Sequence, residues 1–151
     1  MCIDFISRPA WLPLGAALVL ALSTFGSYSS IAAAADIEVT LASNQEVPPS
    51  RSAATGIGTI VVGIDRSVSG SVTTTGIAGT AAHIHEAATG KNGRVIIALA
   101  KVGNTYTVPA GAKLSDTQFA SFQLGNLYIN VHSVAYPGGE IRGQLILPAF
   151  H

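Results

Sequence analysis

The sequence predicts an all-β protein, an antiparallel Greek-key-like β-sandwich or small barrel with one short helix near residues 115–125. Three observations predict this class. Apolar and polar residues alternate with a period of two after residue 36, which is typical of half-buried strands. β-branched segments recur at short intervals between turn residues, and the chain contains 16 glycines. A single segment carries the start and stop signals of a helix.

The first 35 residues have the pattern of an export signal. Arg8 precedes an apolar run over residues 11–22, and small alanines stand directly before Asp36. The strongly apolar part is shorter than the roughly 18 residues that a membrane-spanning helix needs. We therefore expect a signal peptide over 1–35, one domain over 36–151, no stable membrane span after cleavage, and a secreted or periplasmic protein.

Composition restricts the function further. Eight basic residues balance eight acidic ones, which does not fit the basic surface of a nucleic-acid-binding protein. Charged residues make up 11% of the chain and apolar ones 48%, which excludes intrinsic disorder. The single cysteine, Cys2, lies within the expected signal peptide. The exported domain must therefore fold on its hydrophobic core, without a disulfide.

The first strands follow from alternation and from β-branched residues. Residues 37–41 place three aliphatic side chains on one face, and a loop with two prolines follows over 44–52. Two further strands are expected at 57–64 and 68–74, joined by a turn at 65–67.

The middle of the chain predicts three more strands. Residues 81–85 are a short extended segment, and the apolar run over 94–100 predicts a strongly buried strand. Residues 106–108 predict a weaker strand that ends at Pro109, because proline cannot donate a hydrogen bond to a sheet.

The helix signal begins at Ser115. Gln118 stands three residues later, so the two side chains can form a capping box. Phe119 is placed for a hydrophobic staple with the leucine before Ser115, and Gly125 can close the last turn. We expect this helix to carry Phe119 and Phe122 to the core.

The last two strands, 127–133 and 140–147, are expected to form a hairpin with one polar and one apolar face. For both apolar faces to meet one core, the loop must contain an odd number of residues, for example 137–139. His132 is then expected opposite or diagonal to Arg142 and Gln144. The residues expected to share the polar face as a hydrogen-bond network are Tyr128, Asn130, Glu140, Arg142 and Gln144.

Three histidines form a candidate metal site. His83 and His85 stand two apart on one strand and face the same side, and His132 lies on another strand. Imidazole nitrogens are suitable ligands for copper and zinc, with Glu86, Glu140 or water in a remaining position. The alternative is that the histidines are neutral members of the hydrogen-bond network, where they fix the pairing of the strands.

Three segments resemble the motifs of the chordin-type CHRD domain family. They are residues 82–95 around the histidine pair, residues 125–133, and the segment 136–145 that reads YPGGEIRGQL. The segment Glu46–Pro49 is similar to the first loop of the family. The resemblance covers roughly residues 37–147 and implies a β-rich module outside the cytoplasm, with an unknown protein or cell-envelope partner.

Taken together, these features predict a non-catalytic binding or structural module with a histidine-rich polar site. The chain has no phosphate-binding loop and no nucleophile elbow. An alternative is a copper- or zinc-binding periplasmic protein, either a carrier or a redox protein, because the His-x-His element is similar to the copper-site strand of copper/zinc superoxide dismutases. A third possibility is an adhesive module that self-associates through its sheet edges.

Overall fold

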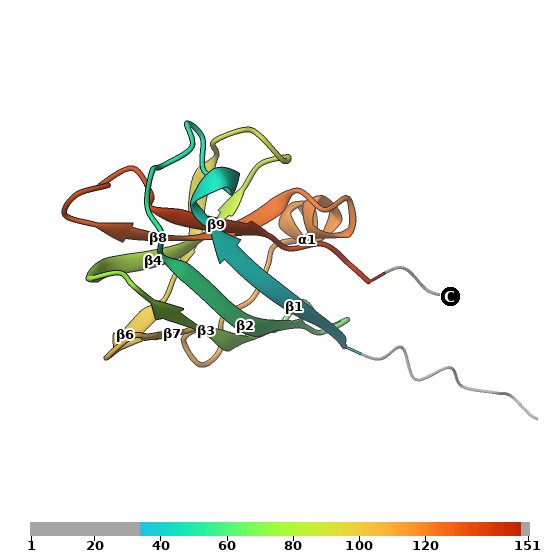
Figure 1. Ribbon diagram of the computed structural model, residues 1–151. Coiled ribbons are helices and arrows are strands. Elements are labelled where there is room, and N and C mark those ends of the chain that lie inside the picture. Colours follow the sequence, from blue (N-terminus) through green and yellow to red (C-terminus); the bar gives the residue numbers. More distant parts are fainter. Residues whose placement is uncertain (1–33, 149–151) are drawn as a thin grey trace, which may run out of the picture. The chain divides into compact units, whose positions relative to one another are not determined.

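The computed structural model describes residues 34–148, which fold as one antiparallel sheet with short helical segments (Figure 1). The strands are β1 (Ala35–Ala42), β2 (Thr55–Val62), β3 (Val68–Thr75), β4 (Gly79–Glu86), β5 (Arg94–Ala98), β6 (Ala100–Val102), β7 (Thr105–Thr107), β8 (Leu127–Ser133) and β9 (Ile141–Gln144). A 3-10 turn, η1 (Ser43–Gln45), follows β1, and helix α1 (Asp116–Gln123) precedes β8. The expected all-β class with one short helix is confirmed.

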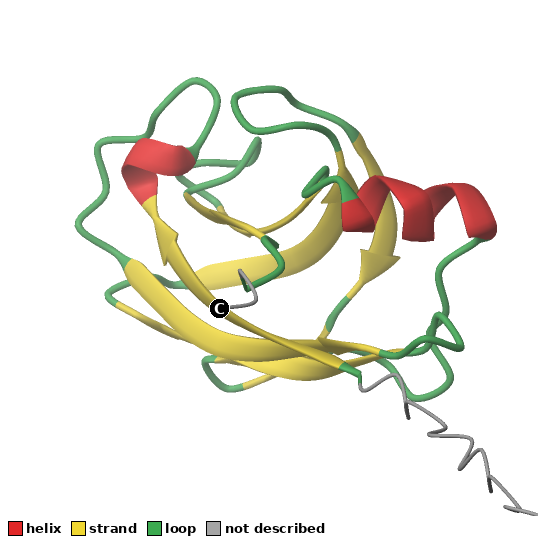
Figure 2. Ribbon diagram, turned by 90° about the vertical axis from the view of Figure 1, so that its right-hand side faces the viewer, coloured by secondary structure: helices red, strands yellow, loops and turns green. Residues whose placement is uncertain are grey.

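The sheet rolls up until its two edges nearly meet (Figure 2). The strand order is β5-β4-β8-β9-β1-β2-β3-β7-β6, so the edge strands are β5 and β6. These two strands are consecutive in the chain and are separated only by Leu99, whose backbone N–H donates to Ala82 O at 2.9 Å. One residue can join opposite edges only if the sheet is curled, so the fold is close to a small barrel.

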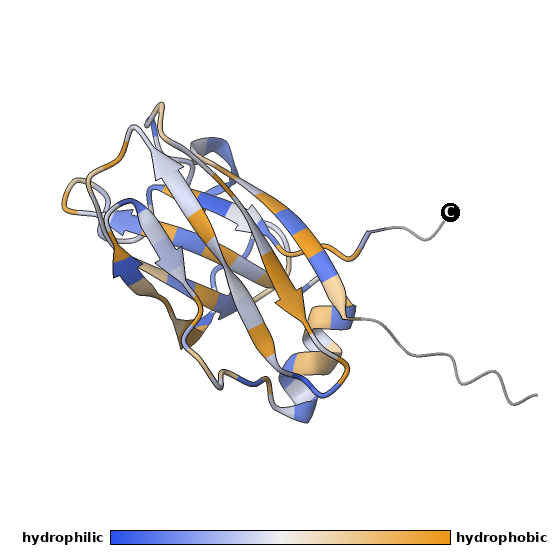
Figure 3. Cartoon of the chain, turned by 90° about the horizontal axis from the view of Figure 1, so that it is seen from below, coloured by the Kyte–Doolittle hydropathy of each residue, from blue (hydrophilic) through white to orange (hydrophobic). Residues whose placement is uncertain are grey.

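The core lies inside the rolled sheet and is built by the predicted alternation. Apolar and polar residues follow one another along most strands (Figure 3). The apolar side chains on the strands that are at most 1% exposed are Ile37, Leu41, Ile60, Val72, Ala82, Ile84, Tyr106, Leu127, Ile129, Val131 and Ile141. Burial of this apolar surface supplies the main driving force for folding.

The parity expected for the last hairpin is confirmed. Val131 pairs with Ile141 and both are fully buried in the core, while the neighbouring pair Asn130 and Arg142 points to the opposite face. Nine residues lie between Val131 and Ile141, an odd number, as parity requires. The expected position of His132 is confirmed for Arg142 but not for Gln144. His132 lies diagonal to Arg142, which pairs with Asn130, whereas Gln144 pairs with Tyr128 farther along the strand.

Residues 94–100 do not form a strongly buried strand as expected. They divide into β5 and β6, and no residue among them is fully buried. Ile96, Ile97 and Leu99 only partly cover the core. The reason is position, since both strands are sheet edges, and an apolar run predicts extension but not the number of neighbours.

Helix α1 begins with the predicted capping box. The Gln118 backbone N–H donates to Ser115 Oγ at 3.2 Å, and the Ser115 backbone N–H donates to Gln118 Oε1 at 2.8 Å. Phe122 is buried in the core, whereas Phe119 is only partly buried against it. The helix therefore closes one side of the rolled sheet mainly through Phe122.

Replacing Ser115 with alanine is expected to lower the free energy of unfolding by about 1 kcal/mol, because one N-terminal N–H loses its acceptor. Urea denaturation followed by circular dichroism measures this loss. Ser69→Ala, on the exposed side of β3, is the matched control and should change stability by less than about 0.5 kcal/mol. Equal effects of the two substitutions would contradict a stabilising role for the cap.

The expected signal peptide lies outside the described residues, apart from its last two alanines. Within residues 34–148, no helix is long and apolar enough to cross a membrane.

Candidate functional site

The structure brings the three predicted histidines together on the polar side of β4 and β8. His83 and His85 share a face of β4, and His132 reaches them from β8, diagonally across from His83. The candidate ligand atoms of the three side chains all lie within 4.8 Å of one another. The ring centroids of His83 and His132 are 4.8 Å apart, and those of His83 and His85 are 5.7 Å apart.

Backbone carbonyls orient two of the three rings. His85 Nδ1 lies 3.0 Å from Gly93 O, and His132 Nδ1 lies 2.9 Å from Pro137 O. A carbonyl can only accept, so both Nδ1 atoms carry the proton and, in the neutral rings, both Nε2 atoms keep a free lone pair. Metal-binding histidines are commonly held in this way by a carbonyl behind the ring.

The free Nε2 lone pairs of His85 and His132 lie within the histidine cluster. His85 Nε2 is buried and has no hydrogen-bond partner. His132 Nε2 lies 3.0 Å from His83 Nδ1, and because His132 Nε2 must accept, His83 Nδ1 donates in the neutral cluster. A cation at this position would replace the His83 proton and would give the His85 nitrogen the partner that it lacks.

The side chains of His85, Tyr128 and Arg142 form a stack next to the histidine cluster. The ring of Tyr128 lies parallel to that of His85, with centroids 4.7 Å apart and an interplanar angle of 5°. The guanidinium carbon of Arg142 lies 3.3 Å from the centroid of Tyr128, a cation–π contact. Arg142 also donates to Asn92 Oδ1 at 3.4 Å and to Gln144 Oε1 at 3.3 Å.

Two loops bury this polar face. The loop after β1 and the loop after β4 rise on the same side of the molecule (Figure 1), and Asn92 Nδ2 ties them together by donating to Val47 O at 2.7 Å. Below them Arg142 is only 1% exposed and Asn130 only 2%. Strand β8 is therefore buried on both of its faces, with an apolar core on one side and a polar interior on the other.

Glu46 is a functional candidate that sequence reasoning missed. Its side chain comes from the first loop and is buried, with Oε1 unpartnered. Burial raises the pKa of Glu46, while Asn130 and the charge of Arg142 act in the opposite direction. Gly139 fits only without a side chain, because a Cβ there would lie 2.4 Å from Glu46 Oε1. Glu46 lies in the motif similar to the first family loop, which was the available signal.

The two carboxylates expected near the histidines have other partners. Glu86 Oε2 accepts from Arg94 at 2.6 Å, and its Oε1 accepts from Ser121 at 2.7 Å. Glu140 accepts from Ser52 at 2.5 Å and from Ser133. The described cluster therefore consists of three histidines without a carboxylate.

Gln144 connects the polar interior to the helix side of the fold. Its Nε2 donates to Ala87 O at 3.0 Å and to Gly125 O at 2.8 Å. It pairs with Tyr128 across β8 and β9. Of the five residues expected to share a polar face, Tyr128, Asn130, Arg142 and Gln144 form two cross-strand pairs on it. Glu140 instead bonds to Ser52 and to Ser133, which has the same parity as the core-facing Val131.

Electrostatics keep two of the histidines neutral. Burial lowers the pKa of His83, and the charges of His132 and His85 lower it further. Burial also lowers the pKa of His85, as do the charges of His132 and Arg142, and together they outweigh the raising effects of Gly93 and Asn130. Neutral imidazole is the form that binds a metal ion.

This lowering predicts acid sensitivity in metal-free buffer. The pKa values of His83 and His85 lie below 6.5 in the folded state, so the unfolded chain binds protons first as the pH falls. The free energy of unfolding should stay constant above about pH 7.5 and fall as the pH drops through 6.5 toward the folded pKa values. Urea denaturation at a series of pH values tests this. The double variant His83→Asn/His85→Asn should flatten the curve, and a rise in stability from pH 7 to 6 would contradict the prediction.

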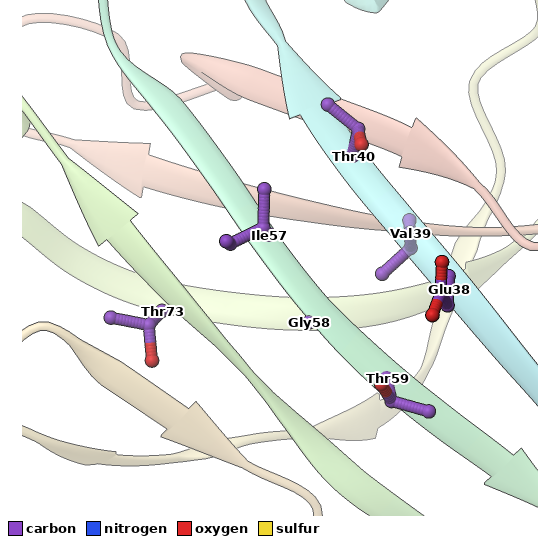
Figure 4. Close-up of a pocket in the computed structure, with 7 residues that line it drawn as sticks. All are labelled: Glu38, Val39, Thr40, Ile57, Gly58, Thr59 and Thr73. Carbon is purple, nitrogen blue, oxygen red and sulfur yellow. The ribbon is translucent and has the colours of Figure 1, made fainter.

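The outer surface of the sheet has a concave region away from the histidine cluster, and this region lacks metal-binding side chains. An open depression of about 520 Å³ lies over β1, β2 and β3 (Figure 4). Its lining side chains are Glu38, Val39, Thr40, Ile57, Thr59 and Thr73. With one carboxylate and no histidine in its lining, it offers no cluster of ligands or titratable groups.

Comparison with known proteins agrees with the motifs. The family model described as CHRD domain matches residues 37–145. No curated protein and no solved structure matches the chain.

Proposed function

The chain belongs to the CHRD domain family, and from this premise we propose that it is an exported, non-catalytic binding module that holds a copper or zinc ion with His83, His85 and His132. One observation carries the proposal. Three imidazoles from two strands place their candidate ligand atoms within 4.8 Å of one another. A metal ion bound at about 2.0–2.1 Å from each nitrogen requires separations no larger than about 4 Å, so only small side-chain shifts are needed.

The hydrogen bonds behind the rings support the same function. A network that served only to join the strands would use both nitrogens of each ring. Here His85 Nε2 is left buried and unpartnered, although unsatisfied buried nitrogens are rare in folded proteins. A bound cation is the partner that would satisfy this atom.

Metal uptake by the purified mature domain tests the proposal. Isothermal titration with Zn²⁺ and with Cu²⁺ should show one site of micromolar or tighter affinity. His83→Ala should weaken binding by at least about tenfold, since one of three ligands is lost. Thr59→Ala, on the outer face of the sheet, is the control and should bind like the wild type. Absence of uptake of zinc and of copper, whether divalent or monovalent, would show that the histidines serve only as a hydrogen-bond network.

Export is proposed from the signal pattern of residues 1–35. The protein should be recovered outside the cytoplasm with Asp36 as its first residue, because small residues precede the expected cleavage position. Mass spectrometry of the protein isolated from its native host measures this terminus. Recovery of the full-length chain in the membrane fraction would contradict cleavage and favour an anchor.

A further inference from the structure

We infer that the three-histidine site selects monovalent copper over divalent ions, because Arg142 places a buried positive charge beside three uncharged ligands. This inference rests on the proposed function and names the ion that the site takes. It combines three features of the described residues: the charge of the ligands, the position of Arg142, and the low number of ligands.

The ligands bring no negative charge. The described cluster holds His83, His85 and His132 only, and each binds a metal as a neutral imidazole. The neighbouring carboxylates Glu86 and Glu140 are held by other side chains. A bound divalent ion would therefore keep its full double charge in the site, whereas a monovalent ion would keep a single charge.

Arg142 adds to this positive charge. Its guanidinium carbon is 3.3 Å from the Tyr128 centroid, which is 4.7 Å from the His85 centroid, so Arg142 lies no more than about 8 Å from the His85 ring. The side chain is 1% exposed, and water and salt therefore screen its charge poorly. Glu46 is the carboxylate whose charge acts on Arg142, and its burial disfavours the charged form.

The size of the effect follows from the distance. At about 8–11 Å and an effective dielectric constant of about 20, each unit of positive charge added to the site is disfavoured on the order of tenfold. A divalent ion meets this repulsion twice and a monovalent ion once. Arg142 thus tilts the ratio of affinities toward Cu⁺ by on the order of tenfold.

The number of ligands acts in the same direction. Monovalent copper is stable with three ligands, whereas zinc held by three histidines takes a water molecule as its fourth ligand. Two of the three rings are already oriented by Gly93 O and Pro137 O, so a site with three nitrogens needs little rearrangement. No further ligand has to be recruited for Cu⁺.

Anaerobic competition tests the inference in the wild-type mature domain. The domain is loaded with Cu⁺ in the presence of a chromogenic Cu⁺ chelator, and Zn²⁺ is then added in about tenfold excess. We expect the copper to be retained. Displacement by zinc would overturn the preference for Cu⁺ and leave the proposed metal function standing, whereas failure to bind any of Cu⁺, Cu²⁺ and Zn²⁺ would overturn both.

Substitutions at Arg142 test its part in the preference. Arg142→Gln, which removes the charge and keeps much of the side-chain volume, should reduce the ratio of Cu⁺ to Zn²⁺ affinity on the order of tenfold. An unchanged ratio in a folded Arg142→Gln domain would overturn the role of Arg142. If Arg142→Gln does not fold, Tyr128→Leu is the second test. It removes the ring that contacts Arg142, so the guanidinium loses its position and the ratio of Cu⁺ to Zn²⁺ affinity should fall. An unchanged ratio in Tyr128→Leu would also overturn the role of Arg142.

Discussion

Replacing Arg142 with alanine is expected to lower the free energy of unfolding by about 3–5 kcal/mol. The side chain is among the most buried in the described part of the protein, although it is a cation. Truncation would remove its contact with the ring of Tyr128 and leave a cavity between the face of the sheet and the loop that carries Asn92. It would also remove the hydrogen bonds that Arg142 donates to Asn92 and Gln144.

Urea denaturation followed by far-ultraviolet circular dichroism measures this loss of stability. Arg94→Ala is the matched control, because Arg94 forms an ion pair with Glu86 but its side chain is 69% exposed. Exposed pairs contribute about 0–1 kcal/mol, so this control should lose little stability. A loss below about 1 kcal/mol for Arg142→Ala would show that the polar interior contributes little to the stability of the fold.

The polar face could be predicted from the sequence because its residues obey a period of two. Alternation placed Tyr128, Asn130 and Arg142 away from the core, and the register of β8 and β9 agrees. Their burial could not be predicted in this way. It depends on two loops, and Asn92 joins these loops across 45 residues of sequence by a contact that no local pattern encodes.

The same limit explains the error over residues 94–100. The apolar run correctly predicted extended structure, but burial depends on whether a strand has neighbours on both sides. Strand β5 pairs with β4 and β6 pairs with β7, and in the described sheet each has a single partner. Edge position is a property of the whole strand order, so short-range hydrophobicity does not reveal it.

Metal binding is expected to stabilise the folded domain by about 2.7 kcal/mol when the free ion is present at about 100 times its dissociation constant. For a domain of this size the thermal midpoint should rise by roughly 10 °C. The effect arises because the site exists only in the fold. His83 and His132 are 49 positions apart in sequence, and their rings meet only when β4 pairs with β8.

His132→Ala isolates this long-range part of the site. It leaves His83 and His85 on one strand, where they remain close even in an unfolded chain, so a metal ion bound to the pair alone would stabilise the fold little. Differential scanning calorimetry with Zn²⁺ should show the rise for the wild type and at most a small rise for the variant. An equal rise in both would mean that the ion binds elsewhere or that His132 is not a ligand, because only a ligand that folding brings to the ion can couple binding to stability.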